Sequence, residues 1–285
     1  MKIGLGLPNA VPDLPGGRVL VELARRADSL GFSTLATIGR LAYPNYEELV
    51  TLAAAAGATE RIGLFTDILL GPARETMLLA KQAASLDQLS GGRFQLGVAV
   101  GAREDDFTLT GHNFHDRGRR WDVALEQMHA AWRGELPPGA TRPSTPRPSN
   151  GVGVPMFFGG QAEQEIRRLV KYGIGYTLGG GTPERLAQMK EKVDAAWKEA
   201  GRSGRPEYRA LSYFAIDAKA QEWGERSLKD YYGGYGDRVW AGAVKTPAEA
   251  KARAEAFEQA GCDELILFAT GPFVEEADRL AEAVL

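Results

Sequence analysis

The segment Thr76–Gly101, which reads TMLLAKQAASLDQLSGGRFQLGVAVG, constrains the fold more than any other part of the chain. Its first half is a helix pattern, in which apolar residues recur at spacings of three and four. The expected apolar face consists of Leu78, Leu79, Ala83, Leu86 and Leu89. The pair Gly91-Gly92 can end this helix through a left-handed backbone conformation. The apolar run Phe94–Val100 then predicts a parallel strand that is buried on both faces, so the segment is one α-to-β step of an α/β repeat.

The same step recurs from one end of the chain to the other. The expected strands are 3–7, 34–37, 61–70, 94–100, 154–158, 174–178, 209–216 and 263–268. Alternation of strands with helices predicts a parallel sheet. Eight such units in 285 residues favour a closed (β/α)8 TIM barrel, formed as a single domain over residues 1–285. A doubly wound open sheet is the alternative, but the first turn, LPNAVPDLPGG, lacks the glycine pattern of a dinucleotide fingerprint.

Two surface excursions interrupt the repeat, near residues 133–153 and 217–245. The first is rich in Pro, Gly, Ser and Thr, which is typical of an irregular loop. The second is dense in aromatic residues and glycine between Trp223 and Tyr235. Because long segments of this kind are uncommon unless functional, we expect both to cover the mouth of the barrel.

Composition excludes several classes of protein. A formal net charge of −3 without a basic stripe gives no support to nucleic-acid binding. The single cysteine, Cys262, excludes an internal disulfide framework and fits a reducing cytoplasm. No apolar run approaches the roughly 20 residues that span a bilayer, and Met1 runs directly into a strand without a signal peptide. We therefore expect a cytoplasmic protein with neither nucleic-acid nor membrane partners.

Two glycine clusters mark the clearest candidate site. Active sites of such barrels form at the C-terminal ends of the strands. Gly159, Gly160 and Gln161 follow the fifth strand, and Gly179, Gly180 and Gly181 follow the sixth. Backbone amides at such turns can approach an anion, and the N-terminus of the next helix adds positive potential. The two clusters together could cradle one phosphate, although each could instead be only a tight turn.

Polar residues at the same strand ends complete the candidate set. Arg103 would face the mouth, where it could meet an anionic cofactor or substrate. Asp67 lies inside an apolar strand, so it must be hydrogen-bonded or paired, either as a structural anchor or as part of the site. His112 is a candidate proton donor. Its spacing to His115 could suit a metal, but no third ligand is evident and no metal is expected. The other candidates are Asn9, Arg40, Thr66 and Gly101.

These residues resemble the bacterial luciferase-like monooxygenase superfamily, which includes flavin-dependent monooxygenases and coenzyme F420-dependent oxidoreductases. The resemblance covers almost the whole chain. Its most specific parts are LAK at 79–81, LDQLSGGRF at 86–94 and LGV at 96–98. Similar segments are TDILLGPAR at 66–74, REDDF at 103–107, RGRR at 117–120 and PMFFGG at 155–160.

The resemblance implies a barrel whose mouth holds a reduced flavin or deazaflavin, with its phosphate at the loops after strands five and six. It also implies that Asn9, Thr66 and Asp67 contact the ring, near a bulge in strand three that sometimes contains a non-proline cis bond. Arg40 and Arg103 would steer anionic or polarised groups. The chain departs from the family pattern after strand two, where luciferases carry histidine and this chain reads TIGR at 37–40.

The function that the resemblance implies is a flavin-dependent oxidoreductase. The leading form is a monooxygenase that uses reduced FMN, supplied by a flavin reductase, and O2 on a small organic substrate. One alternative is an F420-dependent oxidoreductase that transfers hydride, and a second is a flavin-binding protein without catalysis. The resemblance also implies a homodimer.

Overall fold

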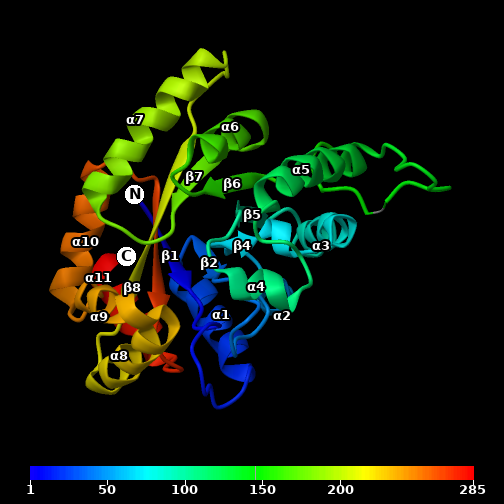
Figure 1. Ribbon diagram of the computed structural model, residues 1–285. Helices are drawn as coiled ribbons and strands as arrows, with labels where there is room; N and C mark the ends of the chain where they lie inside the picture. Colours follow the sequence, from blue (N-terminus) through cyan, green and yellow to red (C-terminus); the bar gives the residue numbers. More distant parts are fainter. Residues whose placement is uncertain (145) are drawn as a thin grey trace.

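The expected parallel sheet is present and closes on itself. In the computed structural model, which describes residues 1–144 and 146–285, helices surround this sheet (Figure 1). The strands are β1 (Lys2–Gly6), β2 (Thr34–Thr37), β3 (Gly63–Thr66), β4 (Leu69–Leu70), β5 (Phe94–Ala99), β6 (Met156–Gly159), β7 (Gly175–Leu178), β8 (Glu207–Phe214) and β9 (Glu264–Ala269). Their order is β3-β2-β1-β9-β8-β7-β6-β5-β4, and a further pairing of β3 with β5 closes the ring. Since β3 and β4 are two pieces of the expected third strand, the prediction of a (β/α)8 TIM barrel is confirmed.

The helices follow the strands nearly where the sequence places them. They are α1 (Arg18–Leu30), α2 (Glu48–Ala56), α3 (Thr76–Leu89), α4 (Glu104–Leu109), α5 (Arg117–Arg133), α6 (Glu163–Tyr172), α7 (Pro183–Glu199), α8 (Ala218–Tyr232), α9 (Gly236–Ala241), α10 (Pro247–Gln259) and α11 (Glu275–Val284). Two short 3₁₀ turns, η1 (Gly71–Ala73) and η2 (Gly233–Tyr235), complete the set. No helix in the described part of the chain is long and apolar enough to cross a membrane.

The apolar face of α3 differs from the expected one. Leu79, Ala83 and Leu86 are buried, but Leu78 and Leu89 are 54% and 77% exposed. Leu78 and Leu89 are three helical turns apart, so they lie on the same exposed face of α3. The spacing of apolar residues alone does not distinguish this face from the buried one. The helix instead packs through its small residues, because alanine lets it approach the neighbouring elements closely. The end of the helix is as predicted, since Gly91 and Gly92 have φ values of 66° and 83°.

Only the first of the two excursions departs from the expectation. The loop after α5 projects from the barrel rather than covering its mouth (Figure 1). It is fastened to the last turn of α3, where Gln88 donates to the Arg147 carbonyl and Asp87 accepts from the Ser149 amide. That turn leads into the start of β5, so the loop belongs to the opposite end of the barrel. The segment 217–245 is largely helical, and Asp217 caps α8 by accepting from the Lys219 amide.

Side chains fill the interior of the barrel toward the N-terminal ends of the strands. Arg209 and Glu264 form a buried ion pair of 2.8 Å near the start of β8 and β9. The Arg209 guanidinium lies 4.5 Å from the Phe65 ring centre and 4.1 Å from that of Phe157. Cys262, at the N-terminal end of β9, is buried as a packing residue. This packing closes the floor, so space for a ligand lies toward the C-terminal ends of the strands.

Candidate functional site

A cavity opens at the C-terminal ends of the strands, where barrels of this architecture bind ligands. It contains about 1120 Å³ of space between protein atoms, part of it open to solvent. We call it the mouth cavity. Its walls come from the ends of β2, β5, β6, β7 and β8, from the β3–β4 connection and from the last turn of α8. Predicted site residues that line it are Arg40, Asp67, Gly101, Arg103, Gly159, Gly160 and Gly179.

The two glycine turns lie side by side on the rim of this cavity. β6 and β7 are paired in parallel, with Gly159 opposite Thr177, so the turn at Gly160 and the turn at Gly179 leave the barrel together. A Cβ atom built on Gly179 or Gly180 would meet no other atom within 4 Å. The space above the Gly179–Gly180 turn is therefore open, whereas a Cβ on Gly159 would lie 2.6 Å from Ile68 Cδ1 and one on Gly160 would lie 2.9 Å from Glu165 Cγ. The prediction that both clusters share one rim is confirmed, and phosphate binding there stays a prediction.

A second cavity, which we call the side cavity, adjoins the mouth cavity. The two share Gly179, Leu211, Tyr213 and Tyr232. From Gly180 and Gly181 the side cavity extends past the N-terminus of α7 to two arginines, Arg238 on α9 and Arg253 on α10.

The side cavity has two arginines and one carboxylate, Glu184, in its lining, so cations outnumber anions there. Arg253 is held by neutral acceptors, since it donates to Ser212 Oγ at 2.8 Å and to the Gly242 carbonyl at 3.0 Å. Burial lowers the pKa of this guanidinium, which stays far above neutral pH. Gln161 is exposed, and its side chain accepts a hydrogen bond from Arg185 beside the same rim. The result is a glycine-rich rim with cations beyond it.

Asp67 is placed by a bulge in the third strand. β3 pairs Phe65 with Gln95, whereas β4 pairs Leu69 with Val98, so this strand has one more residue than β5 between the two pairs. The expected bulge is therefore present, and the peptide bond between Asp67 and Ile68 is cis. Asp67 is 2% exposed and lines the mouth cavity.

The two carboxylate oxygens of Asp67 have different environments. Oδ1 accepts from Thr177 Oγ1 at 2.8 Å, while Oδ2 is buried without a protein partner. Burial raises the pKa of this carboxyl to about 7, although the Thr177 hydrogen bond and the Arg209 charge oppose the rise. Asp67 can therefore hold or release a proton near neutral pH, and one of its oxygens is free to contact a ligand.

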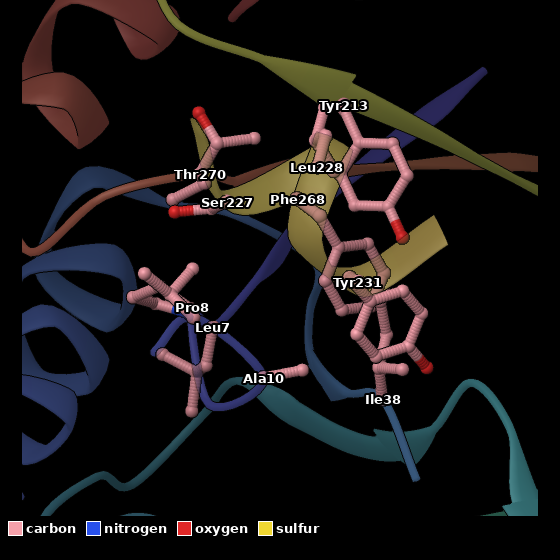
Figure 2. Close-up of a pocket in the computed structure, with 12 residues that line it drawn as sticks. Leu7, Pro8, Ala10, Ile38, Tyr213, Ser227, Leu228, Tyr231, Phe268 and Thr270 are labelled. Atoms are coloured by element: carbon pink, nitrogen blue, oxygen red, sulfur yellow. The ribbon is translucent and has the colours of Figure 1, made fainter. Parts of the chain in front are cut away.

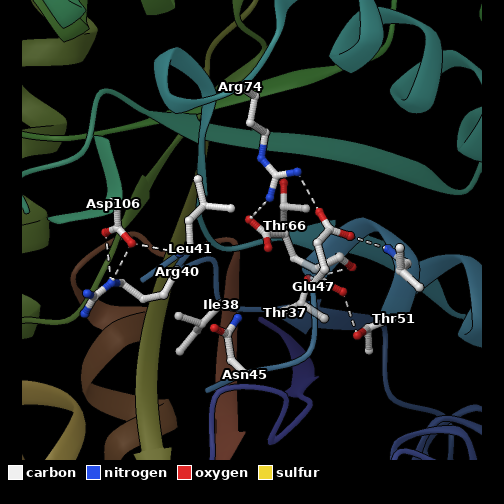
Figure 3. Close-up of polar contacts among 12 residues, drawn as sticks. Thr37, Ile38, Arg40, Leu41, Asn45, Glu47, Thr51, Thr66, Arg74 and Asp106 are labelled. Atoms are coloured by element: carbon white, nitrogen blue, oxygen red, sulfur yellow. Dashed lines mark hydrogen bonds and ion pairs between the residues drawn. The ribbon is translucent and has the colours of Figure 1, made fainter. Parts of the chain in front are cut away.

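The two predicted arginines differ in their partners. Arg40 is buried and forms ion pairs with Asp106 at 2.9 Å and Asp105 at 2.7 Å. Asp106 also accepts from the backbone amide of Leu41 (Figure 3) and from that of Ala42. The Arg40 charge is thus used to anchor the loop after β2 to α4, which makes it a structural residue as well as part of the wall.

Arg103, by contrast, is half-buried and contacts neutral groups. It donates to the Tyr231 carbonyl at 2.9 Å, and its guanidinium lies 4.8 Å from the centre of the Tyr231 ring. Its charge therefore remains available to a ligand in the mouth cavity.

Three predicted residues lie away from the mouth cavity. Asn9 is fully buried, donates to the Ile38 and Tyr46 carbonyls and accepts from the Ile38 amide, so it joins the loops after β1 and β2. Thr66 bridges β3 to β5 by donating to the Gly97 carbonyl and accepting from the Gly97 amide. His112 lies in a groove beside α5, which it shares with Arg119 and Val123. Asn9 and Thr66 therefore stabilise the barrel by joining neighbouring segments. His112 does not line the mouth cavity.

A tyrosine cluster at the end of α8 lies in the segment Trp223–Tyr235, which was predicted from the sequence to cover the mouth, although no individual tyrosine was singled out. Tyr213 and Tyr232 share a hydrogen bond of 2.8 Å between their hydroxyls, and both line the mouth cavity with Tyr231. Burial raises the pKa of all three phenols, which therefore stay neutral. Tyr43, from the loop after β2, packs its ring edge-on against Tyr231 at 5.0 Å. The aromatic and glycine content of this segment predicted a cover over the mouth, but it did not indicate which tyrosines line the cavity.

A second buried carboxylate supports the bulge from outside. Glu48 forms an ion pair of 2.7 Å with Arg74, which also contacts Glu47 (Figure 3). A Cβ on Gly39 would lie 2.3 Å from Glu48 Oε1 and 2.9 Å from the Ile68 carbonyl oxygen, so glycine is needed for this close packing. Burial raises the pKa of Glu48 to about 7 despite the nearby Arg74 charge.

The chemistry of the site is that of a partly enclosed cavity lined by neutral phenols and several charged side chains. The mouth cavity offers one carboxyl that titrates near neutral pH, the Arg40–Asp106 ion pair, and two arginines with neutral partners, Arg103 and Arg117. In the described ranges 1–144 and 146–285, no group of three or more His, Cys, Asp or Glu side chains is arranged to hold a metal ion. Such an arrangement can bind a planar, partly apolar group with an anionic tail.

Comparisons with known proteins match the chain over its whole length. Residues 1–284 match the model of a family described as luciferase-like monooxygenase. The 4-hydroxyprotoasukamycin monooxygenase of Streptomyces nodosus subsp. asukaensis is 26% identical over 260 residues, covering 82% of this chain and 68% of that protein. The crystal structure of monooxygenase RslO1 from Streptomyces bottropensis superimposes with a TM-score of 0.82 at 23% identity, covering 99% of this chain and 97% of that chain. An F420-dependent secondary alcohol dehydrogenase in complex with an F420-acetone adduct superimposes with a TM-score of 0.80 at 18% identity, covering 99% and 98%.

Proposed function

The chain belongs to the luciferase-like monooxygenase family, and on this premise we propose that it is a flavin-dependent oxidoreductase. The specific form that we propose is a monooxygenase that uses reduced FMN and O2 on a small organic substrate. A flavin reductase would supply the reduced FMN. When bound, the flavin supplies the redox chemistry, and the protein supplies binding, orientation and electrostatics.

One observation carries the proposal: the two glycine turns line a single cavity, and the space above Gly179 is open. Gly160 and Gly179 both line the mouth cavity, and a Cβ on Gly179 would project into unfilled space. Bare backbone at two adjacent turns can approach a flavin tail more closely than side chains would allow. Arg238 and Arg253 lie beyond the turns, where they can pair with its phosphate.

Asp67 and Arg103 have complementary roles in this proposal. The unpartnered Oδ2 of Asp67 can accept a hydrogen bond from an N–H group of the ring, or donate one when the carboxyl is protonated. Arg103, in the loop after the adjacent strand β5, can attract the polarised part of the ring or substrate. Tyr231 and Tyr232 cover this space, and exclusion of water protects reactive species.

The second candidate is an F420-dependent oxidoreductase that transfers hydride. The extent of the side cavity favours it, because this cavity continues past the phosphate-sized rim at Gly179 to Arg238 and Arg253. A longer anionic tail could follow this path. One relative is named as a monooxygenase, and one structural neighbour is named as F420-dependent. Both FMN and F420 should therefore be tested as cofactors.

Binding and reactivity measurements distinguish these functions. We expect oxidised and reduced FMN to bind the purified protein in fluorescence titrations, and the reduced complex to consume O2 in the presence of an organic substrate. Tight binding of F420 together with no reaction with O2 would assign the second function. Flavin binding without turnover across a broad panel of substrates and electron donors would assign a binding protein without catalysis.

A further inference from the structure

Two tyrosines form a hydrogen-bonded pair at the boundary between the mouth cavity and the side cavity. Tyr213 belongs to β8, and Tyr232 is the last residue of α8. Their hydroxyl oxygens are 2.8 Å apart, and both residues line both cavities. We call these two residues the tyrosine pair. The pair therefore faces space that a ligand can occupy.

Tyr213 is the fixed member of the tyrosine pair. It is 8% exposed, and its ring packs near that of Phe268, with the ring centres 6.2 Å apart. Figure 2 shows the hydroxyls of Tyr213 and Tyr231 both directed away from Thr270. Because a buried strand residue in a packed core has little freedom to move, Tyr213 holds its hydroxyl in one place.

Tyr232 is the more accessible member of the pair. It is partly exposed, because α8 ends at this residue and Gly233 follows it. Its ring meets the ring of Tyr213 edge-on at 6.0 Å and that of Tyr231 edge-on at 4.9 Å. Two neighbouring rings thus orient Tyr232 at the surface of the cavities.

The tyrosine pair has one more hydroxyl proton than it uses. Each phenol can donate one hydrogen bond, and one of the two protons lies between the two oxygens. Across residues 1–144 and 146–285, neither hydroxyl has another hydrogen-bond partner. Burial raises the pKa of both phenols, and the hydrogen bond with Tyr213 opposes the rise at Tyr232. Both phenols are therefore neutral, and Tyr232 is the member that can donate to a ligand.

The charges around the mouth cavity favour an acceptor oxygen that carries negative charge. Arg103 and Arg117 have neutral partners, whereas Arg40 is paired with Asp106. Asp67 opposes them with a single carboxyl, which titrates near neutral pH. Cationic groups therefore outnumber anionic ones in this lining, and a hydrogen bond to an ionised acceptor is stronger than one between neutral groups.

The number of free protons and the other walls favour an oxygen on an aromatic ring. One free phenol proton matches a ligand with one oxygen, whereas a carboxylate has two oxygens that both need partners. Ile68 and Leu211 add apolar surface to the cavity, and Tyr231 adds an aromatic ring. Aromatic side chains pack well against a planar aromatic ligand.

We propose that the mouth cavity binds a phenol as its phenolate, and that Tyr232, positioned by Tyr213, donates the hydrogen bond to the oxygen on the ring. The ring of the ligand lies on the mouth-cavity side of the pair, next to Tyr231. The proposal rests on the proposed function only in calling the phenol a substrate. Binding of the phenolate itself requires no cofactor.

The test compares 4-nitrophenolate with nitrobenzene, which has the same ring and nitro group but lacks the phenol oxygen. The affinity of each for the protein without cofactor is measured by calorimetry at pH 8.5. We expect wild-type protein to bind 4-nitrophenolate at least tenfold more tightly than nitrobenzene. Tyr232→Phe should reduce this ratio about tenfold, which is the size of one hydrogen bond to a charged group, and should leave the affinity for nitrobenzene unchanged. Tyr213→Phe should reduce the ratio by less, because it removes only the supporting hydrogen bond.

Tyr43→Phe is the matched control. Tyr43 belongs to the same group of aromatic rings, but its hydroxyl donates to Asp230 at 2.6 Å and the residue does not line the mouth cavity. It should leave the ratio of the two affinities unchanged. A purely structural effect of any variant would weaken both ligands together, so the ratio reports the hydrogen bond alone.

Several results would overturn the proposal. These are an unchanged ratio in Tyr232→Phe, equal affinity of wild-type protein for the two ligands, or no binding of 4-nitrophenolate by wild-type protein. If Tyr232→Phe does not fold, Tyr213→Phe decides by the same ratio. An FMN and F420 titration of the wild-type protein separates the two hypotheses. Cofactor binding with no effect of Tyr232 on the ratio removes the phenol site alone, whereas Tyr232-dependent phenolate binding by a protein that binds neither cofactor removes the proposed function alone.

Discussion

Thr177 Oγ1 donates a hydrogen bond of 2.8 Å to Asp67 Oδ1, linking two residues that are 110 positions apart in the chain. Thr177 belongs to β7, whose end leads into the glycine turn at Gly179, and Asp67 belongs to the bulge of the third strand. The side chain proposed to meet the ring and the backbone proposed to meet the phosphate are therefore joined by one short bond. We therefore expect a substitution of Asp67 or Thr177 to alter the position of the other residue.

The first prediction concerns the pH dependence of stability through Asp67. Its pKa is about 7 in the folded protein, against an ordinary value near 4 in the unfolded chain. Between these values the folded state binds more protons, so the contribution of Asp67 to stability falls as pH rises and is least favourable above pH 7. Asp67→Asn cannot ionise and can still accept from Thr177. We expect its stability relative to wild type to rise by about 2–3 kcal/mol between pH 5 and pH 8, as measured by urea unfolding.

Glu48 provides the comparison for this experiment, since its pKa is also about 7 but it contacts Arg74. Glu48→Gln should not remove the pH dependence that belongs to Asp67. Parallel stability profiles for wild type and Asp67→Asn from pH 5 to pH 8 would show that the carboxyl is not perturbed.

The second prediction concerns the glycine cradle. Gly179→Val should abolish cofactor binding while leaving the thermal midpoint of unfolding nearly unchanged. The reason is that the new side chain points into open space, where it meets the ligand and not the protein. Gly57→Ala is the matched control, because it also fits without close contacts but lies at the end of α2, before β3. Unimpaired FMN and F420 binding by Gly179→Val in a fluorescence titration would refute the proposed position of the cofactor.

The third prediction separates the two arginines at the mouth. Arg40→Leu leaves Asp106 buried without its ion-pair partner, which should cost about 3–5 kcal/mol of unfolding free energy. Arg103→Leu should change stability by less than about 1 kcal/mol, because its partners are neutral, and should weaken cofactor binding about tenfold. Urea unfolding and FMN titration of both variants check the contrast. A reversed pattern would make Arg40 the ligand contact and Arg103 the structural anchor.

The fourth prediction concerns the side cavity. Arg238→Gln should weaken FMN binding about tenfold and leave riboflavin binding unchanged, since only FMN carries the phosphate that this arginine would meet. The effect on FMN should shrink as salt is added, because the side chain is exposed. Arg25→Gln, at an exposed position on α1, is the control. Equal losses for FMN and riboflavin would place the phosphate elsewhere.

The architecture was predictable from local signals. The strand β2 (Thr34–Thr37) begins and ends at the residues expected from the sequence, and Gly91 has the left-handed conformation expected after α3. Each of these signals depends on the spacing of apolar residues or on the conformational freedom of glycine, which act within a few residues. Eight strands that alternate with helices in one chain are compatible with few topologies, and a closed barrel is one of them.

The partners of charged residues were not predictable in this way. Arg40 was expected to face a ligand, but it pairs with Asp106, which lies 66 positions away. Arg238 and Arg253 lie on helices, where a charged residue has the same sequence signature whether it faces solvent or a cavity. Tyr231 and Tyr232 lie in the segment that was expected to cover the mouth, but the sequence did not indicate that they form the last turn of a helix, α8.

The extra residue in the third strand has a consequence for how this fold can change over time. β5 pairs with β3 before the irregularity and with β4 after it, while Asp67 and Ile68 lie between the two paired stretches. Substitutions at these two positions can thus alter what the barrel presents to a guest molecule without shifting the registration of any neighbouring strand. The ligand contacts of the site can therefore change while the strand pairing of the barrel stays the same.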